Sequence, residues 1–341
     1  MMQKKRYFLI TIALVFLFKF GWAQSGSYAA SFLELGVGAR TLAMGGASAA
    51  APGDLTSVFW NPAGVAMARH LQVGSMYANL FNKLEQQSYV GALIPLMKNG
   101  TIAISWMRLS VDEIPRFEFD EEHARTAYER LHGLAEQLTA GPVDFFSNSN
   151  DVFIFTFARH VPYKLDLGWQ YFEIPIHFGF GANIKYIRQQ LDQNTGSGIG
   201  VDVGGLMHFS LNDIFSGTNY GDLFFALSIQ DIAETRIIWD TDSKHADRVA
   251  RNFKIGFGYT QPLPFIKSML SFNYDIDTRY SGNTHLGTEL LIRSLFALQL
   301  GFNTGFFTAG AGINLWKFRI NYAYQSHDLG NSHRVSLILA F

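Results

Sequence analysis

Residues 177–188 read His-Phe-Gly-Phe-Gly-Ala-Asn-Ile-Lys-Tyr-Ile-Arg, with a large apolar side chain at almost every second position. In an extended strand, successive side chains point to opposite faces. One face would carry Phe178, Phe180, Ala182, Ile184 and Tyr186. The other would carry His177, Gly179, Gly181, Asn183 and Lys185. This stretch therefore predicts a strand with one apolar face and one face of small or polar residues.

The same alternation recurs from about residue 71 to the end of the chain, for example in 199–210, 253–260, 270–276 and 318–325. It predicts about fourteen strands, an even number as in bacterial single-chain barrels. They are expected near 71–81, 85–96, 100–113, 151–163, 172–189, 197–210, 221–239, 248–261, 267–279, 284–293, 295–304, 307–316, 317–326 and 332–341.

The polar face distinguishes a membrane barrel from a water-soluble sandwich, which would carry many charges on its outer faces. Here that face consists mainly of Gly, Ser, Thr and Asn with scattered charges. No stretch after the first twenty or so residues is long and apolar enough for a spanning helix, so strands would have to cross the membrane. We therefore predict an all-β fold, a transmembrane antiparallel barrel formed by 71–341.

Composition agrees with this fold and excludes some functions. The 341 residues include 15% aromatic residues and 32 Gly, and the formal net charge is −1. The absence of Cys rules out disulfides and thiolate metal sites. The near-zero net charge gives no reason to expect nucleic acid, whose binding requires neutralised phosphates.

The first residues have the three parts of a secretory signal peptide. Lys4, Lys5 and Arg6 precede an apolar run at 7–18, and Gly21-Trp22-Ala23 follows. We expect residues 1–23 to be a signal peptide that exports the chain. The alternative, an uncleaved anchor, needs a run of about 20 apolar residues, which this run does not reach.

The last residues form a predicted strand that ends in Phe341. Val335, Leu337 and Leu339 share its apolar face with Phe341. A terminal aromatic residue of this kind is typical of the signal that the barrel-assembly machinery recognises. We therefore expect a Gram-negative-type cell outer membrane, with its lipid and that machinery as partners.

The longest connection, 115–150, follows the third strand and is expected on the extracellular side. Within it, Ala127, Leu131, Leu134 and Leu138 recur at helical spacing. We predict a short amphipathic helix within 119–138, capped by Asp120. It would cover loop backbone, or serve as a ligand lid or partner site.

Residues 24–70 do not alternate and are rich in small side chains. They contain Gly36-Val37-Gly38-Ala39-Arg40, Leu42-Ala43-Met44-Gly45-Gly46-Ala47 and Trp60-Asn61-Pro62-Ala63-Gly64-Val65-Ala66. Asn61 before Pro62 is typical of a helix start, because Asn caps and Pro fits the first turn. Small residues allow close packing of backbone.

This string resembles the start of the PorV/PorQ family of outer-membrane proteins, which is similar in fold to the FadL long-chain fatty-acid transporters. The resemblance implies an N-terminal hatch, or plug, formed by 24–70 inside the lumen. Asn61, Pro62 and Ala63 would form the hatch turn, while Gly45 and Gly46 would let the hatch approach the wall. Their expected role is structural packing, with direct ligand contact as the alternative.

The resemblance also implies a function. Named members of the PorV/PorQ family assist type IX protein secretion, so we expect a non-enzymatic accessory that binds the translocon or its cargo. The alternative is FadL-like passage of a hydrophobic small molecule through a gap in the wall. The shared plug and the largely small or apolar inner faces favour that alternative, for example at Val152, Ile154, Thr156 and Ala158. A purely structural role is a third possibility.

No pattern indicates an enzyme. His-Glu-x-x-His, a phosphate-binding loop and Gly-x-Ser-x-Gly are all missing. His285, His327 and His333 are interpreted as histidines at the barrel rim, and the His and Glu residues of 121–132 as a solvated helix face. We expect no catalytic residues, metal or cofactor.

Charged residues with both signs are expected on the inner face, where they would pair across the lumen or with the hatch. A mixture of signs argues against a strongly ion-selective pore. The candidates are Lys185, Asp202, Lys254, Asp275, Glu289, Arg293 and Arg319.

Overall fold

The computed structural model describes residues 29–51, 54–96, 99–117, 142–166, 168, 173–215, 219–279 and 283–341. The predicted signal peptide and the predicted helix within 119–138 lie outside these residues. Among the described residues, no helix combines the length and hydropathy needed to cross a membrane.

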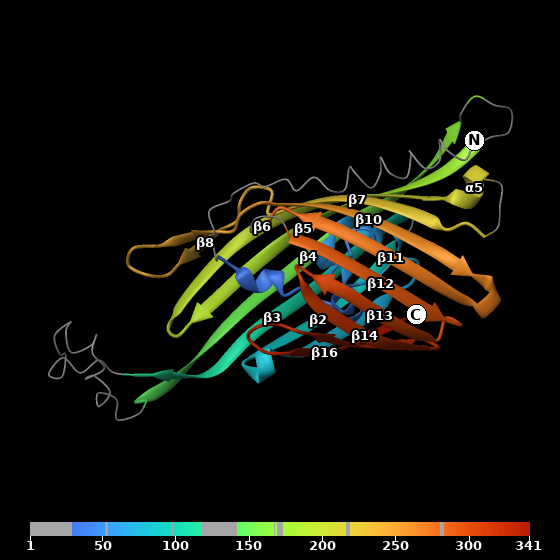
Figure 1. The fold of residues 1–341 in the computed structure, drawn as a ribbon. Helices are drawn as coiled ribbons and strands as arrows, with labels where there is room; N and C mark the ends of the chain where they lie inside the picture. Colours follow the sequence, from blue (N-terminus) through green and yellow to red (C-terminus); the bar gives the residue numbers. More distant parts are fainter. Residues whose placement is uncertain are drawn as a thin grey trace.

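Fourteen antiparallel strands, β1–β7 and β10–β16, form a closed ring, because β1 pairs with β16 and β5 pairs with β6 (Figure 1). The predicted barrel is therefore confirmed, and a strand lies in each of the fourteen predicted segments. The strands of the ring are β1 (Gln72–Leu80), β2 (Glu85–Leu96), β3 (Gly100–Arg116), β4 (Asp144–Asp166), β5 (Glu173–Leu191), β6 (Asn194–Ser210), β7 (Asp222–Gln230), β10 (Asn252–Leu263), β11 (Ser268–Asp277), β12 (Asn283–Ile292), β13 (Phe296–Asn303), β14 (Phe306–Leu315), β15 (Phe318–Gln325) and β16 (Ser332–Ala340).

The outward face of the ring is an apolar belt. Ile184, Leu227 and Leu300 are 56%, 62% and 53% exposed, and their strand neighbours Lys185, Ser228 and Gln299 are buried. Strands β11–β16 have 8 to 10 residues, close to the roughly 9–11 that a tilted strand needs to span a bilayer. The alternation in the sequence is therefore an alternation between the belt and the lumen.

A charge placed on this belt should destabilise the folded barrel. We expect Leu300→Arg, in the middle of β13, to lower the free energy of unfolding from lipid vesicles by about 2–4 kcal/mol. Leu329→Arg is the control, because Leu329 is 66% exposed in the connection between β15 and β16. Equal stability of the two variants would contradict an apolar belt in contact with lipid.

One predicted strand, 221–239, is wrong in its extent. β7 ends at Gln230, and the chain then turns through Asp231, which has φ 52° and is fully buried. The following strands β8 (Arg236–Trp239) and β9 (Ala246–Arg248) form a hairpin outside the ring. The turn occurs because the Asp231 carboxylate pairs with Lys185 inside the lumen, at 2.9 Å.

The barrel has two distinct ends. The β8–β9 hairpin projects from one, which we call the β8–β9 end. At the other, the Phe341 end, the backbone N–H of Phe341 donates to the carbonyl of Leu71 (2.9 Å), so the first and last strands meet there.

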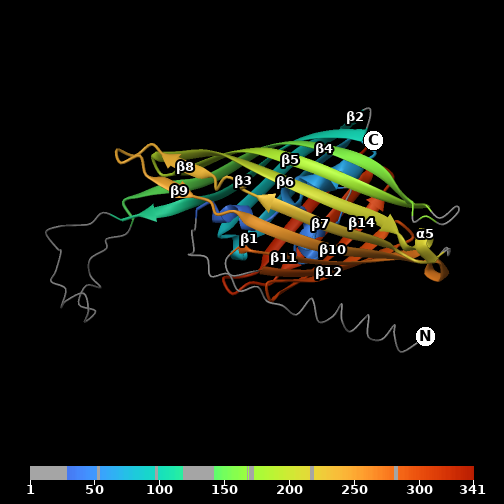
Figure 2. The ribbon, with the colours of Figure 1, turned by 90° about the horizontal axis from the view of Figure 1, so that it is seen from above.

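The described residues of segment 29–70, which are 29–51 and 54–70, lie inside the lumen (Figures 1 and 2). It contains η1 (Ser31–Glu34), α2 (Ala39–Ala43), α3 (Ser57–Trp60) and η2 (Pro62–Met67). The predicted helix start at Asn61 is confirmed, since the Asn61 side chain accepts from the backbone N–H of Ala63 (3.0 Å). The helix that follows is a 3-10 helix. We call 29–70 the hatch segment.

Candidate functional site

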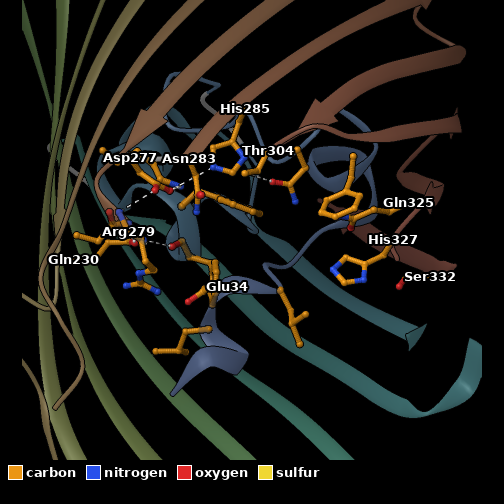
Figure 3. A pocket seen from close by; sticks show the side chains of 18 of the residues that line it. Glu34, Gln230, Asp277, Arg279, Asn283, His285, Thr304, Gln325, His327 and Ser332 are labelled. Atoms are coloured by element: carbon orange, nitrogen blue, oxygen red, sulfur yellow. Dashed lines mark hydrogen bonds and ion pairs between the residues drawn. The ribbon is translucent and has the colours of Figure 1, made fainter. Parts of the chain in front are cut away.

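Two of the cavities lined by described residues lie in the lumen beside the wall formed by β10–β15. The first, the Trp60 cavity, has a volume of about 340 Å³ and lies at the β8–β9 end. Figure 3 shows Asp277, His285 and Thr304 on its wall side and Glu34 on the hatch segment. Its lining is mixed, because the wall contributes mainly polar residues and the hatch segment contributes Trp60 and other apolar side chains.

The second cavity, the Arg319 cavity, has a volume of about 280 Å³ and lies toward the Phe341 end. Arg319 of β15 and Glu289 of β12 line it on the wall side, and Arg40 and Asp54 line it on the hatch side. Both cavities touch the same strands, but at opposite ends of them. The two cavities thus face each other across the hatch segment.

Residues 43–50 of the hatch segment separate the two cavities. A row of small residues on the inner wall lets this backbone approach the strands closely. A Cβ at Gly287 would collide with the backbone of Met44, and one at Gly301 with the backbone of Gly45. At Gly256 a Cβ would come within 2.8 Å of the Ala49 Cβ. We call residues 43–50 the seal.

The seal is held to the wall by hydrogen bonds from three strands. On β11, Asp275 accepts from the backbone N–H groups of Ser48 and Ala49, both at 2.7 Å. On β12, the His285 Nδ1 lies 2.9 Å from the carbonyl of Gly45. On β14, the Thr308 hydroxyl donates to the carbonyl of Ala43 (2.8 Å). The seal therefore combines these polar contacts with the packing of small apolar side chains, since Ala49 and Ala50 lie in a buried cluster with Leu206 and Phe224.

A bidentate ion pair fixes the chain next to the seal. Arg40 Nε and Nη2 each lie 2.7 Å from a Glu289 oxygen, and Gln299 also donates to Glu289 (2.9 Å). Burial acts to lower the pKa of the Arg40 guanidinium, but the Glu289 carboxylate more than offsets it, so that pKa is raised. Arg40 therefore stays charged and keeps helix α2 attached to β12.

The opposite side of the hatch segment is held by apolar packing against β2–β4. Leu55, Val58 and Val65 are fully buried against Leu93 and Ala158 of the wall. This packing removes apolar area from water and so anchors the segment. The hatch segment is thus attached by large apolar side chains on one side, and by small apolar side chains and hydrogen bonds at the seal.

The hatch turn predicted from the sequence lies against β5 and β6. Asn61 Nδ2 donates to the carbonyls of Ala49 (2.9 Å) and Gly205 (3.3 Å). A Cβ at Gly181 would collide with the backbone of Pro62. Ala63 is fully buried, and Gly46 lies beside Trp60 and His285. In the described part of the chain, neither cavity is lined by Gly46, Asn61, Pro62 or Ala63.

The charged candidates fall into separate groups. Lys185 and Asp202 pair at 2.7 Å, and Lys254 lies 3.5 Å from Asp277. Arg319 lies 3.5 Å from Asp54 of the hatch segment. Asp275 and Glu289 hold the seal and its neighbour, as described above.

Two sequence interpretations need correction. Arg293 was predicted to face the lumen, but β12 ends at Ile292 and Arg293 is an exposed turn residue with φ 51°. His285 was interpreted as a rim histidine, but it is only 6% exposed and contacts the seal. Its place in the alternation, between Thr284 and Leu286, was a signal that it faces inward.

Sequence reasoning missed the charged site residues of the hatch segment and one inward-facing arginine of the wall. Arg40 and Asp54 lie in the hatch segment, where no period shows which side chains face the wall. Arg334 of β16 was passed over, although it shares the inward face with Ser332 and Ser336. Among the described residues, no cluster of three or more His, Asp or Glu side chains could hold a metal ion.

Comparison with known proteins gives distant structural likenesses. The chain is similar to a TodX monoaromatic hydrocarbon channel mutant, with 10% identity and a TM-score of 0.48, covering 89% of this chain and 98% of that chain. It is also similar to a Rhodopseudomonas blastica porin mutant, with 9% identity and a TM-score of 0.30, covering 80% and 98%. No protein-family model and no curated protein matches the sequence. TM-scores this low assign no function.

Proposed function

We propose that this chain is an outer-membrane barrel that passes a small solute through its lumen, with the seal as the barrier. The observation that carries the proposal is the pair of cavities on either side of residues 43–50, along the same wall strands. A displacement of the seal away from β10–β14 would join them. The apolar belt, the fourteen-stranded ring and the predicted export and assembly signals support an outer-membrane location.

The asymmetry of the hatch attachments supports movement at the seal. Large apolar side chains anchor the segment on β2–β4, while the seal has mostly small side chains and adds hydrogen bonds to Asp275, His285 and Thr308. Hydrogen bonds can be exchanged for bonds to water or solute at modest net cost, about 0.5–1.5 kcal/mol each for neutral pairs. The seal can therefore shift while the anchored side stays in place.

Weakening the seal should increase passage. Asp275→Ala removes the acceptor of two buried backbone N–H groups, and leaving a buried donor without an acceptor costs about 1–3 kcal/mol for each group. Since about 1.4 kcal/mol corresponds to a factor of ten, we expect at least a roughly tenfold higher flux of glucose through the variant in liposomes. Thr308→Val, which removes one neutral bond, should give a smaller increase.

Asp213→Ala is the matched control, because Asp213 is exposed in α5 (Leu211–Phe215), away from the seal. Its flux should equal that of the unaltered protein. The proposal would be wrong if the folded protein and both seal variants passed no glucose above empty liposomes.

A secretion accessory of the PorV/PorQ type is the second candidate. The observation that favours it is the length of β3–β6, which have 17, 23, 19 and 17 residues where about 9–11 suffice to span a bilayer. β3 and β4 continue beyond the ring as a two-stranded extension, a surface on which a partner protein could dock.

Gene deletion separates the two candidates. Under the transport proposal, the deletion strain should lose uptake of labelled solute and keep its secreted proteome. A changed secretome with normal uptake would favour the secretion role instead.

A further inference from the structure

A buried arginine that forms no ion pair with the described residues lines the Trp60 cavity. Arg334 on β16 is 2% exposed, and its Nε and Nη1 atoms have no hydrogen-bond partner. No carboxylate of the described residues forms an ion pair with it. The other cations of this cavity are paired, since Lys254 lies 3.5 Å from Asp277 and Arg279 lies 3.5 Å from Asp231.

An unpaired buried cation is costly, because burial removes its hydration and nothing replaces it. Such a group is rare in native structures and calls for an explanation, of which a bound ion or a functional role is one. The planar guanidinium presents parallel N–H donors that match the two oxygens of a carboxylate or phosphate. Arg334 therefore indicates an anionic group in the ligand of this cavity.

The rest of the lining indicates what the anion is attached to. Amide and hydroxyl side chains come from the ends of several strands, and some of them are labelled in Figure 3. They include Gln230, Asn283, Asn303, Thr304, Gln325 and Ser332. Such groups both donate and accept hydrogen bonds, so they suit a ligand with several hydroxyl groups better than a hydrocarbon.

Aromatic rings in the same cavity offer flat apolar faces. Phe306 stacks on His327, with ring centroids 4.6 Å apart. Phe81 contacts the same His327 ring in an edge-on geometry, with centroids 4.9 Å apart. Trp60 lies on the hatch side, with the Lys254 ammonium 5.0 Å from its ring centroid. The volume of about 340 Å³ is within the range of small-molecule sites, about 300–1,000 Å³.

We propose that the Trp60 cavity binds a hydroxylated organic anion, a sugar acid or sugar phosphate, with its acidic group on Arg334. This inference rests on the proposed function in that the bound anion is taken to be the solute that passes. Binding on the β8–β9 side of the seal would then precede movement of the seal.

Isothermal titration calorimetry on the full-length protein in detergent tests the site with four probes: glucuronate, glucose 6-phosphate, glucose and decanoate. We expect at least one of the two sugar anions to bind at least about tenfold more tightly than neutral glucose and than decanoate. A preference between the two distinguishes carboxylate from phosphate. The inference would be overturned if neither sugar anion bound, if glucose bound as tightly, or if decanoate bound more tightly than both.

Arg334→Gln should reduce the affinity for the preferred sugar anion at least about tenfold, and Arg334→Lys should keep part of it. Arg293→Gln, at an exposed turn arginine, is the control and should bind as the unaltered protein does. Because Arg334 forms no ion pair with the described residues and its Nε and Nη1 have no hydrogen-bond partner, its replacement by Gln should not lower the unfolding temperature. Unchanged affinity in a folded Arg334→Gln protein would contradict the site.

The flux measurement tests the proposed function, and the binding measurement tests the proposed site, so each can fail without the other. If liposomes pass glucose but the protein binds neither sugar anion, this inference is wrong and the proposed function stands. If a sugar anion binds at Arg334 but no solute crosses, the site stands and the proposed passage is wrong.

Discussion

Replacing Lys185 by methionine is expected to lower the free energy of unfolding by about 3–5 kcal/mol, the usual cost of leaving a buried ion pair without one partner. The Lys185 ammonium lies 2.7 Å from Asp202 and 2.9 Å from Asp231, and the side chains of all three are 6% exposed or less. Without it, no ion pair to Asp202 would remain among the described residues, and Asp231 would keep only Arg279, at 3.5 Å. Equilibrium unfolding in lipid vesicles measures the loss.

Lys164→Met is a matched control for this prediction. Lys164 pairs with Glu173 at 2.8 Å, so the contact has nearly the same length, but its side chain is 74% exposed. Exposed pairs of this kind contribute about 0–1 kcal/mol. If both variants lost the same stability, burial would not be what makes the Lys185 cluster important.

The wall of this protein could be predicted from the sequence, because successive side chains of a membrane-barrel strand alternate between the lipid face and the lumen face. Phe253, Ile255 and Phe257 lie on the belt and Lys254 lies in the lumen, as the alternation indicated. The rule fails where a polar residue ends a strand early. At Asp231 the chain leaves the ring because the carboxylate has a buried partner far away in the sequence.

The lumen was harder to predict, because its contacts join residues more than two hundred positions apart. Arg40 with Glu289 and Ser48 with Asp275 are such pairs. The inward glycines were visible as a pattern, but only the folded chain shows that Gly287 and Gly301 receive the seal. A single sequence contains no information about which inward residue meets which part of the hatch segment.

Arg334 illustrates a different limit of prediction from the sequence. Its inward position follows from the alternation of β16, but its significance lies in the missing partner. An unpaired buried charge is recognised only when every neighbour is in place. Sequence reasoning thus locates the wall, while the cavities and the seal depend on tertiary packing.

Two adjacent glycines of β6 allow a direct test of the link between the hatch turn and the seal. A Cβ at Gly204 would collide with the Asn61 Oδ1, whereas a Cβ at Gly205 meets nothing within 4 Å. Gly204→Val should displace Asn61, which caps η2 and donates to the carbonyl of Ala49 in the seal. Overpacking and loss of the cap together should cost about 2–4 kcal/mol of stability.

The same displacement should raise glucose flux in liposomes, because the Asn61 side chain ties the anchored turn to residue 49 of the seal. Gly205→Val adds the same side chain one position along the strand and should change neither unfolding nor flux. An increase in flux confined to Gly204→Val would mean that the hatch turn, although it lines neither cavity, controls the barrier between them. Equal flux through both variants would restrict control of the barrier to the β10–β14 side.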